Sequence, residues 1–127
     1  MKYKILYEYI PYFENVSSVV VQFRHGIGGN RYDAKFLEFI KDVYRTDLLQ
    51  YSALYKHEMS YIKPKDIFKC DIETIKALIV HYVRAERFSD GMWQSATRKG
   101  YFKVLLKKLC SPRLLQHLRE DQSTEFP

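Results

Sequence analysis

The sequence of 127 residues has few cysteines and no long hydrophobic run. Its two cysteines, Cys70 and Cys110, lie 40 residues apart and form no Cys-x-x-Cys pair, whereas a small secreted domain would use more. We therefore expect two free thiols in a reducing compartment. The longest strictly apolar run has three or four residues, far fewer than the roughly 20 that span a membrane, and residues 1–13 lack the features of a signal peptide. These absences predict a soluble cytoplasmic protein without a membrane partner.

The motifs that usually identify an enzyme are also missing. The glycines of residues 26–30 lack the Gly-Lys-Ser/Thr ending of a phosphate-binding loop and the spacing of a dinucleotide-binding motif, so they predict a turn. None of the four histidines has a second ligand at a spacing typical of a metal site. Neither cysteine has a neighbouring histidine that would make it a nucleophile. We expect no metal and no cofactor, and we favour a non-enzymatic role.

Aromatic residues, by contrast, are abundant. They make up 16% of the chain, and 11 of them are tyrosines. A tyrosine combines a large apolar ring with a polar hydroxyl, so many of these side chains should lie at the edge of a core with the hydroxyl in water. The same property suits a binding surface, because tyrosine and tryptophan are enriched at interfaces. We favour core-edge packing and keep a binding surface as the alternative.

Apolar residues recur at helical spacing through most of the chain, which predicts an all-α fold. We expect a compact bundle of five or six helices in a single domain, residues 1–120, followed by a loose tail at residues 121–127. The strongest helical pattern begins at Asp71 and should form the central helix. One irregular excursion or short hairpin is expected near residues 16–31, where valines precede the glycine-rich turn.

Capping and helix-breaking residues predict the boundaries in the first half of the chain. Pro11 should bend or end a helix over residues 3–14. Asp33 should cap the next helix, and Asp47 should open a shorter one. Residues 58–70 should be a connection that leads to the central helix.

The second half is divided by Gly100. Ser89 or Asp90 should cap a helix that Gly100 ends. A last short helix should begin at Ser111. Between them we expect a helix whose apolar face consists of Phe102, Leu105, Leu106 and Leu109.

The densest group of charged residues comprises Arg84, Glu86, Arg87 and Asp90, followed by the single tryptophan, Trp93. One interpretation is structural. A buried carboxylate must be paired, so either arginine would hold Glu86 and Arg87 would reach Asp90, forming an ion-pair clamp under Trp93. The second is a site for a phosphate-bearing ligand. Catalysis is less favoured, because two carboxylates beside two arginines should be poor general acids and are few for a metal.

The same segment carries a resemblance. Residues 84–91 have the pattern Arg-x-Glu-Arg-Phe-x-Asp-Gly, and the chain also has YIPYF near its N-terminus and Gly100 before a leucine-rich helix. With these features it resembles a family of small bacterial and phage proteins, a domain of unknown function, over roughly residues 5–110. The resemblance implies a bacterial or mobile-element protein of the cytoplasm. It assigns no activity to any residue.

The positive charge is concentrated in one stretch. Residues 98–113 contain no acidic residue and by themselves account for the net charge of +6. Lys99, Lys103 and Lys107 are four residues apart, so they should share a helix face that follows a phosphate backbone while Tyr101 stacks on a base. The alternative is an ordinary solvated helix face. The basic residues of this stretch are Arg98, Lys99, Lys103, Lys107, Lys108 and Arg113.

These features predict a non-enzymatic interaction module that binds a macromolecular partner, either protein or nucleic acid, through the basic face. A small enzyme or a receptor for an anionic ligand, centred on the cluster of residues 84–90, is the alternative. A self-associating domain is a third.

Overall fold

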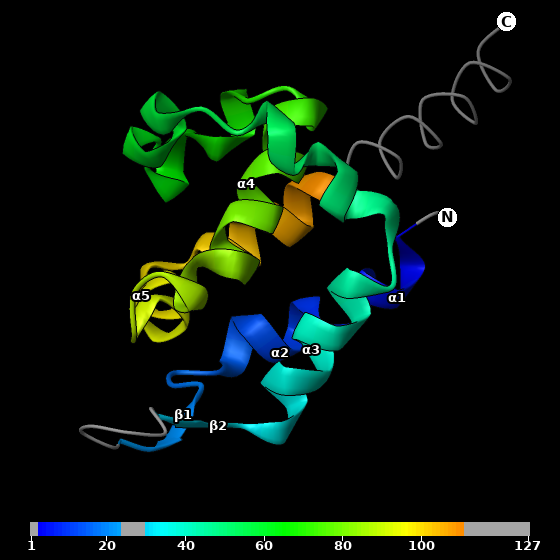
Figure 1. Ribbon diagram of the computed structural model, residues 1–127. Coiled ribbons are helices and arrows are strands. Elements are labelled where there is room, and N and C mark those ends of the chain that lie inside the picture. Colours follow the sequence, from blue (N-terminus) through cyan, green and yellow to red (C-terminus); the bar gives the residue numbers. More distant parts are fainter. Residues whose placement is uncertain (1–2, 24–29, 111–127) are drawn as a thin grey trace, which may run out of the picture.

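The computed structural model describes residues 3–23 and 30–110. Most of these residues are helical, and the strands among them form one short hairpin, so the predicted all-α class with a hairpin excursion is confirmed (Figure 1). The helix expected after Ser111 and the tail at residues 121–127 lie outside the described residues. The extent of the domain, residues 1–120, stays a prediction.

Two short helices, α1 (Lys4–Tyr7) and α2 (Ile10–Asn15), open the described chain. The expected interruption of a helix over residues 3–14 is present, but it does not lie at Pro11, which is in the first turn of α2. A proline is tolerated there, since the N–H that it lacks would have no partner within the helix. The break between the two helices therefore comes before the proline.

The excursion is an antiparallel pair of strands, β1 (Val20–Gln22) and β2 (Arg31–Tyr32). Val20 lies opposite Tyr32, and an irregularity in the register follows. The glycine-rich turn expected between the strands falls almost entirely on residues 24–29, outside the described part of the chain.

Helix α3 (Ala34–Tyr44) follows β2 directly. Asp33 occupies the N-cap position, as expected, but its side chain accepts no hydrogen bond from the helix. Its carboxylate instead accepts a hydrogen bond of 2.7 Å from the hydroxyl of Tyr12 in α2. The boundary was predictable from local sequence, whereas the partner of Asp33 lies 21 residues away.

Three 3₁₀ helices connect α3 to the central helix: η1 (Asp47–Leu54), η2 (His57–Tyr61) and η3 (Pro64–Lys69). The helical segment expected at Asp47 is confirmed, although the cap is Thr46, whose hydroxyl accepts from the N–H of Leu48 at 3.2 Å. Residues 58–70 connect to the central helix as predicted, but most of them are in η2 and η3. Tight 3₁₀ turns are common as connectors and lack a strong periodic signal in sequence.

Helix α4 (Ile72–Arg84) is the predicted central helix, and η1 packs along it. The carboxylate of Asp71 accepts a hydrogen bond of 2.8 Å from the N–H of Thr74, which lowers the pKa of Asp71 and confirms the predicted start. Ile72, the first residue of α4, is exposed. The buried residues of α4 are Ile75, Ala77, Leu78, Ile79, Val80, Tyr82 and Val83.

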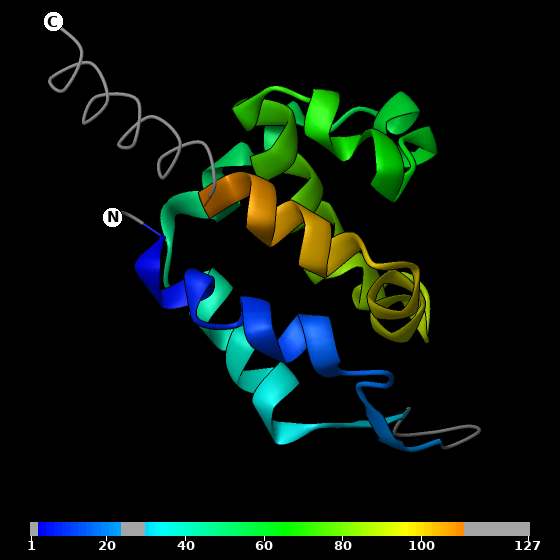
Figure 2. The same ribbon diagram turned by 180° about the vertical axis from the view of Figure 1, so that it is seen from behind.

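After α4 the chain forms η4 (Ala85–Arg87), α5 (Met92–Lys99) and a further helical segment at residues 101–110. Gly100 ends α5 with a φ of 87°, a left-handed conformation that glycine adopts without strain, so its predicted role is confirmed. The predicted apolar face of the next helix is buried as a whole. Figure 2 shows residues 101–110, in orange, lying above α1 and α2.

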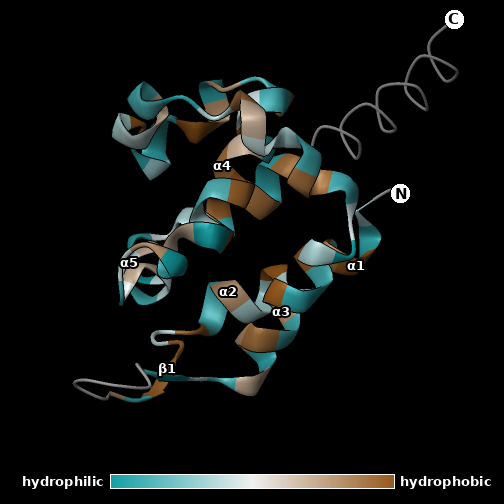
Figure 3. Cartoon of the chain, viewed as in Figure 1, coloured by the Kyte–Doolittle hydropathy of each residue, from teal (hydrophilic) through white to brown (hydrophobic). Residues whose placement is uncertain are grey.

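An aromatic cluster forms the centre of the core. Phe102 stacks on Phe13 at 5.4 Å, and Phe36 and Phe39 pack edge-on against it. Tyr9 packs on Phe39 and donates a hydrogen bond of 2.6 Å to the buried carboxylate of Asp42. Brown and teal segments alternate along the helices in Figure 3, as expected for amphipathic helices around such a core. Core-edge tyrosines with satisfied hydroxyls therefore account for part of the aromatic content.

Candidate functional site

Glu86 is the centre of a hydrogen-bond cluster that joins three parts of the chain. Its Oε2 accepts from the hydroxyl of Tyr32 in β2 and from the N–H of Gly91 at 3.0 Å. Its Oε1 accepts from the N–H of Trp93 at 2.9 Å. Burial and this hydrogen bond to Glu86 raise the pKa of Tyr32, so the hydroxyl stays protonated and donates.

We call these four residues the Glu86 network (Tyr32, Glu86, Gly91 and Trp93). Its carboxylate takes the place of the N-cap side chain that was expected from Ser89 or Asp90. Gly91 is the N-cap of α5, and no side chain at that position accepts from the helix. The first N–H groups of a helix have no partner within it and carry a partial positive charge. The carboxylate of Glu86 therefore stabilises the start of α5 from five residues upstream.

Trp93 and Gln94 fix α5 to its neighbours. The indole N–H of Trp93 donates to the carbonyl of Val83 in α4 at 2.8 Å, and its ring packs edge-on against Tyr32. The side-chain oxygen of Gln94 accepts from the N–H of Val19 at 2.8 Å, and its nitrogen donates to the hydroxyl of Ser18 at 2.9 Å. Sequence analysis missed Tyr32, Gln94 and Ser18, because their partners are more than 50 residues away.

The prediction that ion pairs join the arginines and carboxylates of residues 84–90 into a clamp is wrong. Among the described residues, no ion pair joins Glu86 to Arg84 or Arg87, and none joins Arg87 to Asp90. Arg87 and Asp90 are exposed, whereas Arg84 is half-buried. The α-helix ends at Arg84 and tightens into η4, so the spacing assumed for a continuous helix no longer applies. Glu86 and Trp93 are brought together, and the other three residues are not.

The helix face predicted to carry Lys99, Lys103 and Lys107, here called the lysine stripe, is also interrupted. Lys99 belongs to α5, while Lys103 and Lys107 belong to the next helix, on the other side of Gly100. The left-handed residue reorients the backbone, so the three lysines do not continue one helix face. Lys107 forms an ion pair with Glu14 at 3.2 Å, and Lys103 and Lys108 are half-buried. Arg113 lies outside the described residues.

Tyr101 is unsuited to the base-stacking role predicted for it. Its ring already stacks on Tyr82 at 4.5 Å, and its hydroxyl donates to the carbonyl of Ile62 at 2.9 Å. The side chain is partly buried against the core. An exposed ring elsewhere would have to serve a nucleic-acid partner.

Such a ring is present beside the remaining exposed basic residues. Arg98 and Lys99 line a hollow of about 530 Å³ together with Phe23, Gln94 and Ser95. The Phe23 side chain is 65% exposed, although it lies 75 residues before Arg98 in the sequence. No carboxylate is found among the described residues that line the hollow. We call Phe23, Arg98 and Lys99 the α5–hairpin face.

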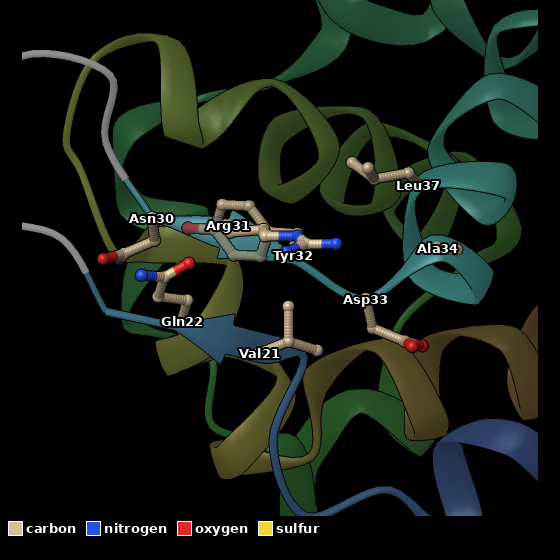
Figure 4. Close-up of a pocket in the computed structure, with 8 residues that line it drawn as sticks. All are labelled: Val21, Gln22, Asn30, Arg31, Tyr32, Asp33, Ala34 and Leu37. Carbon is tan, nitrogen blue, oxygen red and sulfur yellow. The ribbon is translucent and has the colours of Figure 1, made fainter.

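A second hollow, of about 830 Å³, lies on the hairpin itself and includes Arg31, an exposed cation. Figure 4 shows Gln22 and Asn30 at one end of it and Leu37 at the other. Asn30 lines both hollows, so they adjoin at this residue. Arg31 thus extends the positive charge of the α5–hairpin face along β2.

The described residues offer no group of three or more His, Cys, Asp or Glu side chains that could hold a metal ion. Cys70 and Cys110 form no disulfide. Within residues 3–23 and 30–110, no helix has the length and apolar character needed to cross a bilayer.

The fold and the Glu86 network define a small helical domain with one β-hairpin hydrogen-bonded to the segment that contains α5. The chain belongs to DUF6508, a family of unknown function, whose model matches residues 2–113. The resemblance to a domain of unknown function is thereby confirmed. Comparison with curated proteins gives no match, and comparison with solved structures gives none either.

Proposed function

We propose that this domain is a non-enzymatic interaction module of a bacterial or phage cytoplasmic protein, and that it binds single-stranded nucleic acid at the α5–hairpin face. The observation that carries the proposal is the exposed ring of Phe23 beside the exposed Arg98 and Lys99 at one hollow. Single-stranded nucleic acids are bound by basic grooves that follow the backbone and by aromatic rings on which bases stack.

The charges around the face favour a polyanion over a folded protein partner of mixed charge. Arg31, Arg98 and Lys99 lie along the adjoining hollows, and Asp33 is the one acidic residue among the described residues that line them, so positive charges outnumber negative charges by three to one. Positive charge that is not neutralised locally attracts phosphates at long range. The two residues at the end of α5 also interact favourably with the helix dipole, but that interaction does not require an exposed ring beside them.

The test is fluorescence anisotropy with labelled oligo-dT, oligo-rU and a DNA duplex, over a salt series from about 50 to 200 mM. We expect the single strands to bind more tightly than the duplex and to lose affinity steeply with salt. The double variant Arg98→Glu/Lys99→Glu should weaken binding at least about tenfold and flatten the salt dependence. Phe23→Ala should weaken binding to single strands by about fivefold or more, because stacking on one base contributes about 1–3 kcal/mol.

The matched control is Lys63→Glu/Lys65→Glu, which makes the same change in net charge at exposed positions around η3. It should bind nearly as well as the wild type. Equal losses in both double variants would show that only the net charge matters and would contradict the proposed face. Absence of binding to every oligonucleotide at low salt would overturn the nucleic-acid proposal and point to a protein partner.

A further inference from the structure

A small pocket lies where the end of η1 meets the end of α4. Its volume is about 180 Å³, and it is lined by Ser52, Tyr55, Val80, His81, Arg84 and Phe88. None of these residues lines the α5–hairpin face or the hollow on the hairpin. The pocket is therefore a separate feature from the surface of the proposed function.

One wall of the pocket is a fixed pair of rings. The imidazole of His81 stacks on the ring of Tyr55 with centroids 4.0 Å apart and planes only 4° apart. Tyr82, which is buried, packs edge-on against His81 at 5.0 Å. Val80 is fully buried beneath. Burial lowers the pKa of His81, so this wall is uncharged at neutral pH.

The remaining lining has two features that the fold does not require. Arg84 is half-buried, yet among the described residues its side chain has no ion pair and no hydrogen bond. A guanidinium carries five N–H donors in a planar fork suited to a carboxylate or phosphate. Phe88 is 81% exposed, the most exposed of the large hydrophobic side chains in the described chain. No acidic residue lines the pocket, so Arg84 is its one charged group at neutral pH among those described.

We propose that this pocket binds a small aromatic anion, whose carboxylate or phosphate contacts the guanidinium of Arg84 and the hydroxyl of Ser52. The aromatic ring of the ligand lies between Phe88 and the stacked pair Tyr55–His81. The pocket is smaller than the roughly 300–1,000 Å³ of sites for drug-sized ligands, so it suits a single ring with one anionic group. Of the charged cluster that sequence analysis singled out, only Arg84 contributes to this site.

The probes are benzoate, phenyl phosphate and the neutral analogue benzamide, each titrated into the full chain while amide and side-chain NMR shifts are followed. We expect the two anions to shift the signals of Ser52, His81, Arg84 and Phe88, and to bind at least about tenfold more tightly than benzamide. The carboxylate and phosphate arms distinguish which anionic group the pocket prefers.

Arg84→Gln keeps most of the side-chain length and removes the charge, so it should weaken benzoate and phenyl phosphate about tenfold and leave benzamide unchanged. Arg87→Gln is the matched control, since Arg87 is exposed and three residues away. Phe88→Ala should weaken all three probes. If Arg84→Gln fails to fold, Arg84→Lys, which keeps the charge but loses the planar fork, replaces it and should bind the anions with reduced affinity.

Absence of shifts at the pocket residues with benzoate and phenyl phosphate up to about 10 mM, or equal affinity in Arg84→Gln and the wild type, would overturn the proposal. The variant Arg98→Glu/Lys99→Glu should bind benzoate as the wild type does. The outcome at this pocket is therefore independent of the outcome for nucleic acid.

Discussion

The two sides of residues 84–93 differ in how far their polar groups are satisfied within the fold. Glu86 faces the hairpin and accepts three hydrogen bonds, from Tyr32, Gly91 and Trp93. The guanidinium of Arg84, two residues earlier, has no hydrogen bond or ion pair with the described residues. This short segment of charged residues thus has one side that stabilises the fold and one side on which we propose that a ligand binds.

The difference arises from the end of α4. In a continuous helix, both arginines could have reached Glu86, but η4 tightens the backbone and separates them from it. Backbone N–H groups at the start of α5 then become the partners of the carboxylate. Arg84 and Arg87 consequently form no ion pair among the described residues, and of the two only Arg84 lines the pocket.

Replacing the carboxylate should break the structural side with the largest effect. Glu86→Ala removes three hydrogen bonds to a charged acceptor and leaves the first N–H groups of α5 without it, so we expect a loss of about 3 kcal/mol in the free energy of unfolding. The melting temperature measured by circular dichroism should fall by roughly 10 °C. A loss of stability no larger than that of Arg87→Ala would show that the Glu86 network contributes little to the free energy of unfolding.

Removing one hydrogen-bond donor from the Glu86 network should have an intermediate effect on stability. Tyr32→Phe keeps the ring contacts with Trp93 and Phe36 but deletes the hydroxyl that donates to Glu86. We expect a loss of about 1–2 kcal/mol in urea unfolding. In the Glu86→Ala background the same substitution should cost much less, since its partner is already gone. Full additivity of the two changes would contradict a direct interaction.

The side of this segment that carries the pocket should respond to pH through His81. Burial lowers the pKa of His81 below the value of about 6.5 expected in the unfolded chain, so the unfolded state binds the proton more readily. This contribution to stability is present above that pH and is lost as the pH falls toward 5. The rings of Tyr55 and Tyr82 pack against the imidazole, and Arg84 lines the same pocket.

We expect His81→Phe, which can keep the stacking on Tyr55 but cannot be protonated, to show a flatter decline of melting temperature between about pH 7 and pH 5. His57→Gln, at an exposed position, is the control and should follow the wild type. A wild-type profile in His81→Phe would assign the acid sensitivity to another group.

Arg87→Ala should have the smallest effect on stability. Arg87 is exposed and forms no ion pair among the described residues, so we expect a change within about 0.5 kcal/mol. Thermal unfolding alongside Glu86→Ala measures the contrast directly. A large destabilisation by Arg87→Ala would restore the ion-pair clamp that sequence analysis predicted.

Local sequence was sufficient where the relevant interactions span a few residues. The N-cap at Asp71, the left-handed Gly100 and the apolar face of residues 102–109 all follow from contacts within one or two helical turns. Predictions failed where an uninterrupted helix was assumed. The lysine stripe crosses Gly100, and the arginine clamp crosses the junction of α4 and η4.

By itself, the sequence determined the helical class, the central helix and the position of the hairpin, because hydrophobic periodicity and turn residues act over short distances along the chain. Only the tertiary structure decided which groups meet. Tyr32 reaches Glu86 across 54 residues, and Phe23 lies at the same hollow as Arg98. Such long-range contacts depend on how the helices and strands pack around the aromatic core, so they cannot be predicted from local sequence patterns.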